Sequence, residues 1–150
     1  MSFSMIAGLA LAAFSTPPPL DGVIHQRTID HRGTAVQATY HGDVRLSLQD
    51  VGGVTAPGRM SVQRCNWTGI VTVTRRLARA GDAEPMATRI SSDRVLAGSR
   101  AGDCMTGRTA IARDAAKRRP EVEVHLAAVA DADRARIPAD LMAAERLAAR

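Results

Sequence analysis

Two cysteines, Cys65 and Cys104, are the residues of this 150-residue chain with the most predictable chemistry, and they lie 39 positions apart. In an exported chain such a pair predicts one disulfide, whereas in the cytosol it predicts two buried, unreactive thiols. Chain entropy assigns a bridge across a loop of this length roughly 3–4 kcal/mol. Without a Cys-x-x-Cys spacing the pair does not indicate redox catalysis. We therefore expect a structural cross-link if the chain is exported.

The N-terminal segment favours export. Residues 1–20 have no charged side chain, and an apolar run extends from Phe3 to Phe14 before three prolines. This run is too short to span a membrane and has the length of a signal-peptide core. Small residues permit cleavage after Ala12 or after Ser15, although the usual basic residue near the start is missing.

We therefore expect residues 1–15 to be a signal peptide and residues 16–150 to form one periplasmic or secreted domain without a transmembrane segment. Nineteen of the 20 basic residues are arginine, which is typical of a GC-rich bacterial genome. The chain has one tyrosine and one tryptophan. Single-stranded nucleic-acid modules stack bases on several aromatic rings, so this class of partner is excluded. No cofactor is expected.

Three histidines lie close together in the sequence, at His25, His31 and His41. Three imidazoles can bind a metal, but His31 and His41 would stand roughly 30 Å apart at opposite ends of one strand. His25 and His41 could still approach each other. A small hydrolase or metal-dependent enzyme using these two histidines with Asp30 or Asp43 is therefore an alternative hypothesis.

The string from Gly102 to Thr109 matches the phosphate-loop pattern G-x-x-x-x-G-K-[ST] except that Arg108 replaces the lysine. Nucleotide or phosphate binding at this string is a further alternative. A Gly-bearing turn with a Thr106 cap explains the same residues without a ligand.

Charge is distributed unevenly along the chain, whose formal net charge is +5. No acidic residue lies between Asp50 and Asp82, and guanidinium groups match the geometry of phosphate and carboxylate. This stretch is a candidate anion-binding surface, with a basic face neutralised by acids from elsewhere in the fold as the alternative. Its arginines are Arg59, Arg64, Arg75, Arg76 and Arg79.

These groups must be positioned by a sheet in the first half of the chain. Period-two alternation predicts about five short strands joined by tight turns, which indicates an antiparallel meander over residues 22–98. The turns are expected at His31-Arg32-Gly33, His41-Gly42-Asp43 and Ala80-Gly81-Asp82, with a longer loop at residues 52–58. The expected strands are residues 23–30, 34–41, 44–49, 60–76 (kinked near Gly69, or a hairpin) and 89–96.

The second half, residues 104–150, is alanine-rich with helical spacing. Helices are expected over residues 109–119, then from Pro120 and from Pro138, although residues 120–130 also fit a strand. The predicted fold is α+β, a meander with C-terminal helices packed on it. The predicted function is a non-enzymatic envelope or periplasmic accessory protein. Its partner would be an anionic envelope component or another envelope protein.

Overall fold

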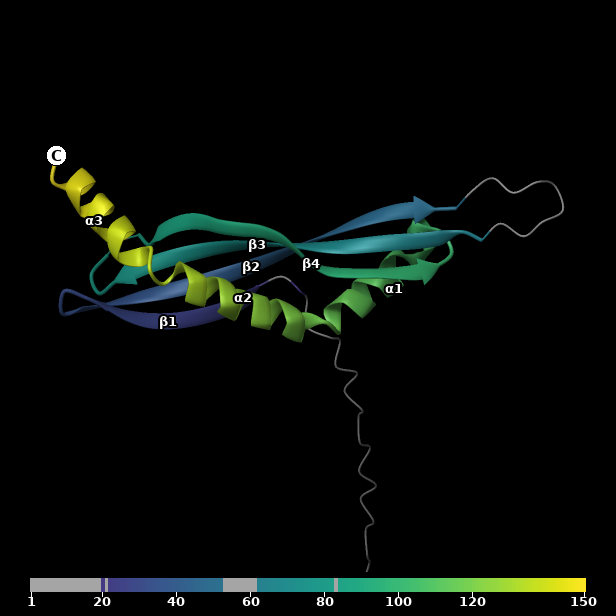
Figure 1. Cartoon of the computed structure of the whole chain (residues 1–150), viewed down its shortest axis with the longest axis horizontal. Coiled ribbons are helices and arrows are strands. Elements are labelled where there is room, and N and C mark those ends of the chain that lie inside the picture. The colour runs from purple at the N-terminus through teal and green to yellow at the C-terminus, as the bar shows by residue number, and fades with distance from the viewer. Residues whose placement is uncertain (1–19, 21, 53–61, 83) are drawn as a thin grey trace, which may run out of the picture.

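The computed structural model describes residues 20, 22–52, 62–82 and 84–150, so the predicted signal peptide and Arg59 lie outside the described residues. The fold is α+β, as expected: one antiparallel sheet in the order β1-β2-β3-β4, followed by three helices (Figure 1). The elements are β1 (Val23–His31), β2 (Thr34–Val51), β3 (Arg64–Arg79), β4 (Met86–Ala101), α1 (Cys104–Ala116), α2 (Arg119–Asp133) and α3 (Ile137–Ala148).

The β1–β2 hairpin closes at the predicted turn. Arg32 and Gly33 both have positive φ, at 54° and 79°. Two successive residues of this kind form the turn whose twist matches that of the flanking strands. The Asp30 carboxylate accepts a hydrogen bond from the Gly33 N–H and holds the turn closed.

The sheet has four strands rather than about five because Gly42 does not form a turn. It lies within β2, where it pairs with Val23 of β1 and Val73 of β3. A Cβ atom at this position would stand 2.7 Å from Leu126 Cδ1 of α2. The glycine is therefore a point of close approach between strand and helix, and two predicted strands are one 18-residue strand.

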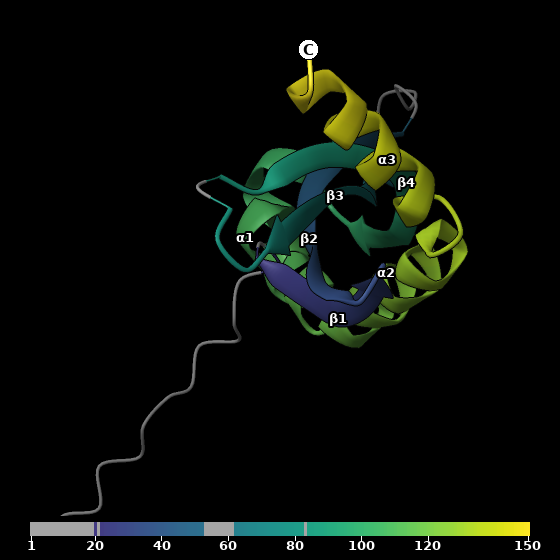
Figure 2. The same cartoon turned by 90° about the vertical axis from the view of Figure 1, so that its left-hand side faces the viewer.

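The sheet curves around the side on which α2 lies, and Figure 2 shows the strands arranged in an arc. The pairing of β3 with β4 shifts register between Gly69 and Ile70 and again between Val73 and Thr74. Such bulges bend a strand and increase its twist. As a result α2 contacts all four strands, including both edge strands, β1 and β4.

The helical half follows the proline signals. Pro120 and Pro138 each lie in the first turn of their helices, α2 and α3, where a missing N–H costs nothing. Residues 120–130 are helical, which resolves the strand alternative. α1 begins at Cys104, five residues before the predicted start. No helix in the described ranges has both the length and the apolar character that crossing a membrane requires.

The core lies between the sheet and the helices and contains both aromatic side chains of the described residues other than histidine, Tyr40 and Trp67. The Arg118 guanidinium stands 5.8 Å from the centre of the Trp67 ring, so this arginine covers the ring as a cation–π partner. The rest of this core is aliphatic, with Val36, Val71, Val73, Leu96, Ile111, Leu126 and Ile137 among its most buried members.

Candidate functional site

Strand alternation divides the side chains of the sheet between two faces. The covered face packs against the helices and includes Tyr40 of β2 and the odd-numbered positions of β3 from Cys65 to Leu77. The open face is turned away from the helices and includes the even-numbered positions of β3 from Arg64 to Arg76. Every arginine on a strand can be assigned to one face by the register.

The four arginines on the covered face are all ion-paired with the helices. Each pairs with an acid that lies 14 to 104 positions later in the chain. The pairs are Arg27 with Asp131, Arg75 with Asp133 and Asp140, Arg79 with Glu145, and Arg100 with Asp114. These arginines attach the helices to the sheet.

The pairs of Arg75 form a buried network. Arg75 donates to Asp133 Oδ2 at 2.7 Å and also to Asp140, while the Tyr40 hydroxyl donates to Asp133 Oδ2 at 3.0 Å. Burial, followed by the nearby Asp133 charge, raises the pKa of Tyr40 to about 12. Tyr40 and Arg75 are fully buried and Asp133 is 3 % exposed, whereas the Asp140 side chain is 45 % exposed and forms the solvent-facing end of the network.

A second network attaches α3 to the tip of the first hairpin. The Glu145 carboxylate accepts a hydrogen bond from Arg79 at 2.7 Å, and it also lies 3.6 Å from His31 Nε2. The hydrogen bond from Arg79, aided by the charges of Arg79, Arg32 and His31, holds the pKa of Glu145 below its ordinary value. This carboxylate is therefore charged, and it connects α3 to β3 and to the first hairpin.

The open face carries five exposed arginines that make no ion pair within the part of the chain that the structure describes. Only two aspartates, Asp30 and Asp43, lie at open-face positions of the described strands. The arginines are Arg45 of β2, Arg64 and Arg76 of β3, and Arg89 and Arg94 of β4. The open face is therefore a surface on which positive charge exceeds negative charge.

A hollow of about 480 Å³ lies on this face. Arg45 and Arg89 line it from the two strands that flank β3, together with Asp43, Thr72 and Ser92. The Thr72 and Ser92 hydroxyls stand 3.3 Å apart, within hydrogen-bond distance. Two guanidinium groups beside two hydroxyls can hold a phosphate or carboxylate, because both groups donate hydrogen bonds to anionic oxygens.

The predicted anion-binding set is divided by this geometry. The prediction is wrong for Arg75 and Arg79, because both project to the covered face and are ion-paired with carboxylates of α2 and α3. Arg64 and Arg76 lie on the open face. The sequence reasoning missed Arg45, Arg89 and Arg94, which share that face. For Arg45 the sequence did hold a signal. It alternates with the apolar residues Val44, Leu46 and Leu48, which places it on the face opposite to theirs.

The histidine hypothesis is also corrected. His25 pairs with Tyr40 on the covered face, and their ring centres are 6.3 Å apart. His41 is the next residue along β2 and therefore projects from the open face. The two imidazoles are on opposite sides of the sheet, so they cannot converge on one metal or substrate.

The phosphate-loop match at Gly102 to Thr109 is not a loop. α1 begins at Cys104, and the Asp103 carboxylate accepts hydrogen bonds from the Thr106 N–H at 2.9 Å and from its hydroxyl at 2.8 Å. Asp103, rather than Thr106, caps the helix. These hydrogen bonds hold the pKa of Asp103 below its ordinary value, and this fixed negative charge occupies the end of the helix that would attract a phosphate.

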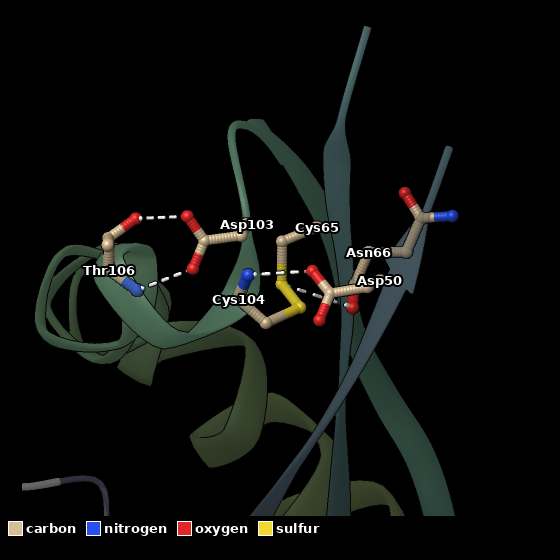
Figure 3. Close-up of a disulfide and its surroundings, with 6 residues drawn as sticks. All are labelled: Asp50, Cys65, Asn66, Asp103, Cys104 and Thr106. Carbon is tan, nitrogen blue, oxygen red and sulfur yellow. Dashed lines mark hydrogen bonds between the residues drawn. A yellow bond between two sulfur atoms is a disulfide. The ribbon is translucent and has the colours of Figure 1, made fainter. Parts of the chain in front are cut away.

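The cysteines form the expected cross-link (Figure 3). Cys65 of β3 and Cys104 of α1 are joined by a disulfide, with Cα atoms 4.9 Å apart. Asp50 Oδ1 accepts a hydrogen bond from the Cys104 N–H at 2.8 Å beside this bridge. The Asp50 and cysteine ligand atoms lie within 4.8 Å of one another, but sulfur atoms bonded to each other do not supply the thiolates that a metal needs.

Comparisons with known proteins found no family model, no curated protein and no solved structure that matches this chain.

Proposed function

We propose that this protein is an exported, non-enzymatic accessory protein of the bacterial envelope that holds an anionic partner against the open face of its sheet. The observation that carries the proposal is the division of the strand arginines. The covered-face arginines are paired with acids of the helices, whereas Arg45, Arg64, Arg76, Arg89 and Arg94 have no such partner among the described residues.

This division has an energetic meaning. The charge of a guanidinium beside a fixed carboxylate is already largely neutralised, and some of its N–H donors are occupied. An exposed guanidinium without such a partner exchanges only water and mobile ions when it binds an anion. Each basic residue near an anionic lipid surface contributes about 1 kcal/mol at physiological ionic strength. Five unpaired arginines opposed by two aspartates therefore favour an anionic partner, with an affinity that falls as salt screens the charges.

Export is supported by two features. The N-terminal apolar run has the length of a signal-peptide core. The Cys65–Cys104 disulfide is of a kind that persists in oxidising compartments such as the periplasm. The helix attachments also leave the open face free, because α2 and α3 pair with covered-face residues.

The test is binding of the purified, oxidised protein to phosphatidylglycerol vesicles, to phosphatidylcholine vesicles and to immobilised polygalacturonate, at low and high salt. We expect binding to at least one anionic probe at low salt, loss of that binding at high salt, and no binding to the neutral vesicles. The triple variant Arg45→Gln/Arg89→Gln/Arg94→Gln should lose most of the binding.

A matched control removes the same charge elsewhere. Arg108 and Arg113 of α1 and Arg134, the residue that follows α2, are exposed residues for which the structure gives no ion pair, and they do not lie on the sheet. The triple variant Arg108→Gln/Arg113→Gln/Arg134→Gln should keep the binding. Equal weak binding to anionic and neutral probes, or equal losses in the two triple variants, contradicts the proposal.

A further inference from the structure

The open-face arginines follow one another along the length of the sheet. Arg64 lies near the start of β3, and Arg76 lies twelve positions further along the same strand. Arg45 and Arg94 flank Ile70 between them, and Arg89 is paired with Thr74. At about 3.3 Å per residue the cations extend over roughly 40 Å. A ligand that meets all of them must therefore be long.

Neutral hydrogen-bonding side chains lie among the arginines. The open face carries hydroxyls on all three strands concerned, at Thr39, Ser47, Thr68, Thr72, Thr74 and Ser92. Hydroxyl groups both donate and accept, so they suit a ligand that is itself rich in hydroxyls. The aromatic side chains Tyr40 and Trp67 are buried on the covered face, so stacking on tyrosine or tryptophan is not available on the described part of the open face.

The shape of this surface separates two kinds of anionic partner. The sheet curves around the α2 side, so the open face is the outer, convex side of the curve (Figure 2). A flat bilayer touches a convex, twisted surface over a small part of its length. A linear polymer can follow the twist and reach each arginine in turn.

Building on the proposed function, we propose that the open face binds a linear anionic polysaccharide, with carboxylate or phosphate groups along the chain, that lies lengthwise over β3. Its anionic groups contact Arg64, the Arg45–Arg94 pair with the adjacent hollow, Arg89 and Arg76 in that order. Its hydroxyls exchange hydrogen bonds with the Thr and Ser side chains between them.

The test measures the affinity of the oxidised protein for galacturonate oligomers of increasing length, with phosphatidylglycerol vesicles and a DNA duplex as competitors. We expect the affinity to rise with chain length until the oligomer covers roughly 40 Å, and then to stop rising. Long oligomers should outcompete vesicles and duplex DNA presented at equal concentrations of anionic groups.

Two double variants locate the polymer on the face. Arg64→Gln/Arg76→Gln removes the two ends of the row of arginines. It should weaken the binding of long oligomers by about fivefold for each arginine, but leave the affinity for a trisaccharide unchanged. Arg45→Gln/Arg94→Gln removes the centre of the row and should weaken the binding of both the long oligomers and the trisaccharide. All four arginines are exposed, and unchanged thermal unfolding of each variant shows that the fold is intact.

Affinity that is independent of oligomer length overturns the inference, as does tighter binding to the vesicles or to duplex DNA. In these cases binding to an anionic probe persists, so the proposed function is retained and only the proposal of a linear polysaccharide is rejected. Absence of binding to oligomers, vesicles and DNA alike contradicts both.

Discussion

Arg75 of β3 and Asp133 of α2 form a buried ion pair at 2.7 Å, although 58 positions separate them in the chain. Neither side chain has access to bulk water, and the Tyr40 hydroxyl donates to the same carboxylate oxygen. A buried pair of this kind is a weak source of net stability, but removal of one partner leaves a charge without compensation. The pair therefore defines where the end of α2 attaches to the sheet.

The first prediction concerns that attachment. Asp133→Ala should reduce the free energy of unfolding by about 3 kcal/mol, at the lower end of the usual range for a broken buried pair, because Arg75 retains Asp140. Urea unfolding followed by circular dichroism measures the loss. Asp131→Ala is the control, since Asp131 lies on the same helix and pairs with Arg27 at the surface. Its loss should be about 1 kcal/mol or less, and equal losses would contradict the assignment.

The second prediction is the titration of Tyr40. Its pKa is raised from 10.0 to about 12, chiefly by burial and next by Asp133, so the folded state holds this proton more tightly than the unfolded state. The resulting stabilisation is complete below pH 10 and decreases as the pH rises toward 12. The chain has one tyrosine, so near-ultraviolet absorbance reports this group alone.

Asp133→Asn should lower the pKa of Tyr40 but leave it above 10.0, because burial remains. A Tyr40 pKa near 10.0 in the unmodified, folded protein would show that the hydroxyl is not buried against Asp133.

The third prediction contrasts two glycines. Gly42→Ala should destabilise by about 1–3 kcal/mol, because the added methyl group would stand 2.7 Å from Leu126 Cδ1 in a filled core. Gly107→Ala in α1 should stabilise by about 0.5–1 kcal/mol, since its methyl group finds ordinary contacts at 3.5 Å or more and alanine favours the helix. Thermal unfolding gives both values. Adding Leu126→Val to Gly42→Ala should recover part of the stability that Gly42→Ala loses. If the destabilisations of the two single variants simply add in the double variant, the contact between these residues is contradicted.

The fourth prediction concerns the disulfide. Cys65→Ser and Cys104→Ser should destabilise the oxidised protein by similar amounts, roughly 3–4 kcal/mol each, and the double variant by no more than the worse single variant. Intact-mass measurement with an alkylating reagent, without reductant, reports the bond directly. Alkylation of both thiols in protein taken from an oxidising compartment would disprove the bridge and weaken the case for export.

Local patterns in the sequence were sufficient to predict several elements. The alternation of Val44, Leu46 and Leu48 predicted a strand, and Pro120 and Pro138 marked the first turns of two helices. The fold class follows from these signals because periodicity and proline restrictions act within a few residues. Gly42 misled for the same reason, since a glycine at a turn and a glycine under a packed helix look alike without the helix.

The candidate site could be predicted only in part. The sequence by itself determined that the chain is basic and that arginines alternate with apolar residues along the strands. Only the tertiary structure decided which arginines remain available. The acids that neutralise Arg75 and Arg79 arrive from α2 and α3, 58 to 66 positions away. The open-face arginines come together because pairing aligns three strands. Both outcomes depend on chain segments that are distant in sequence and adjacent only after folding.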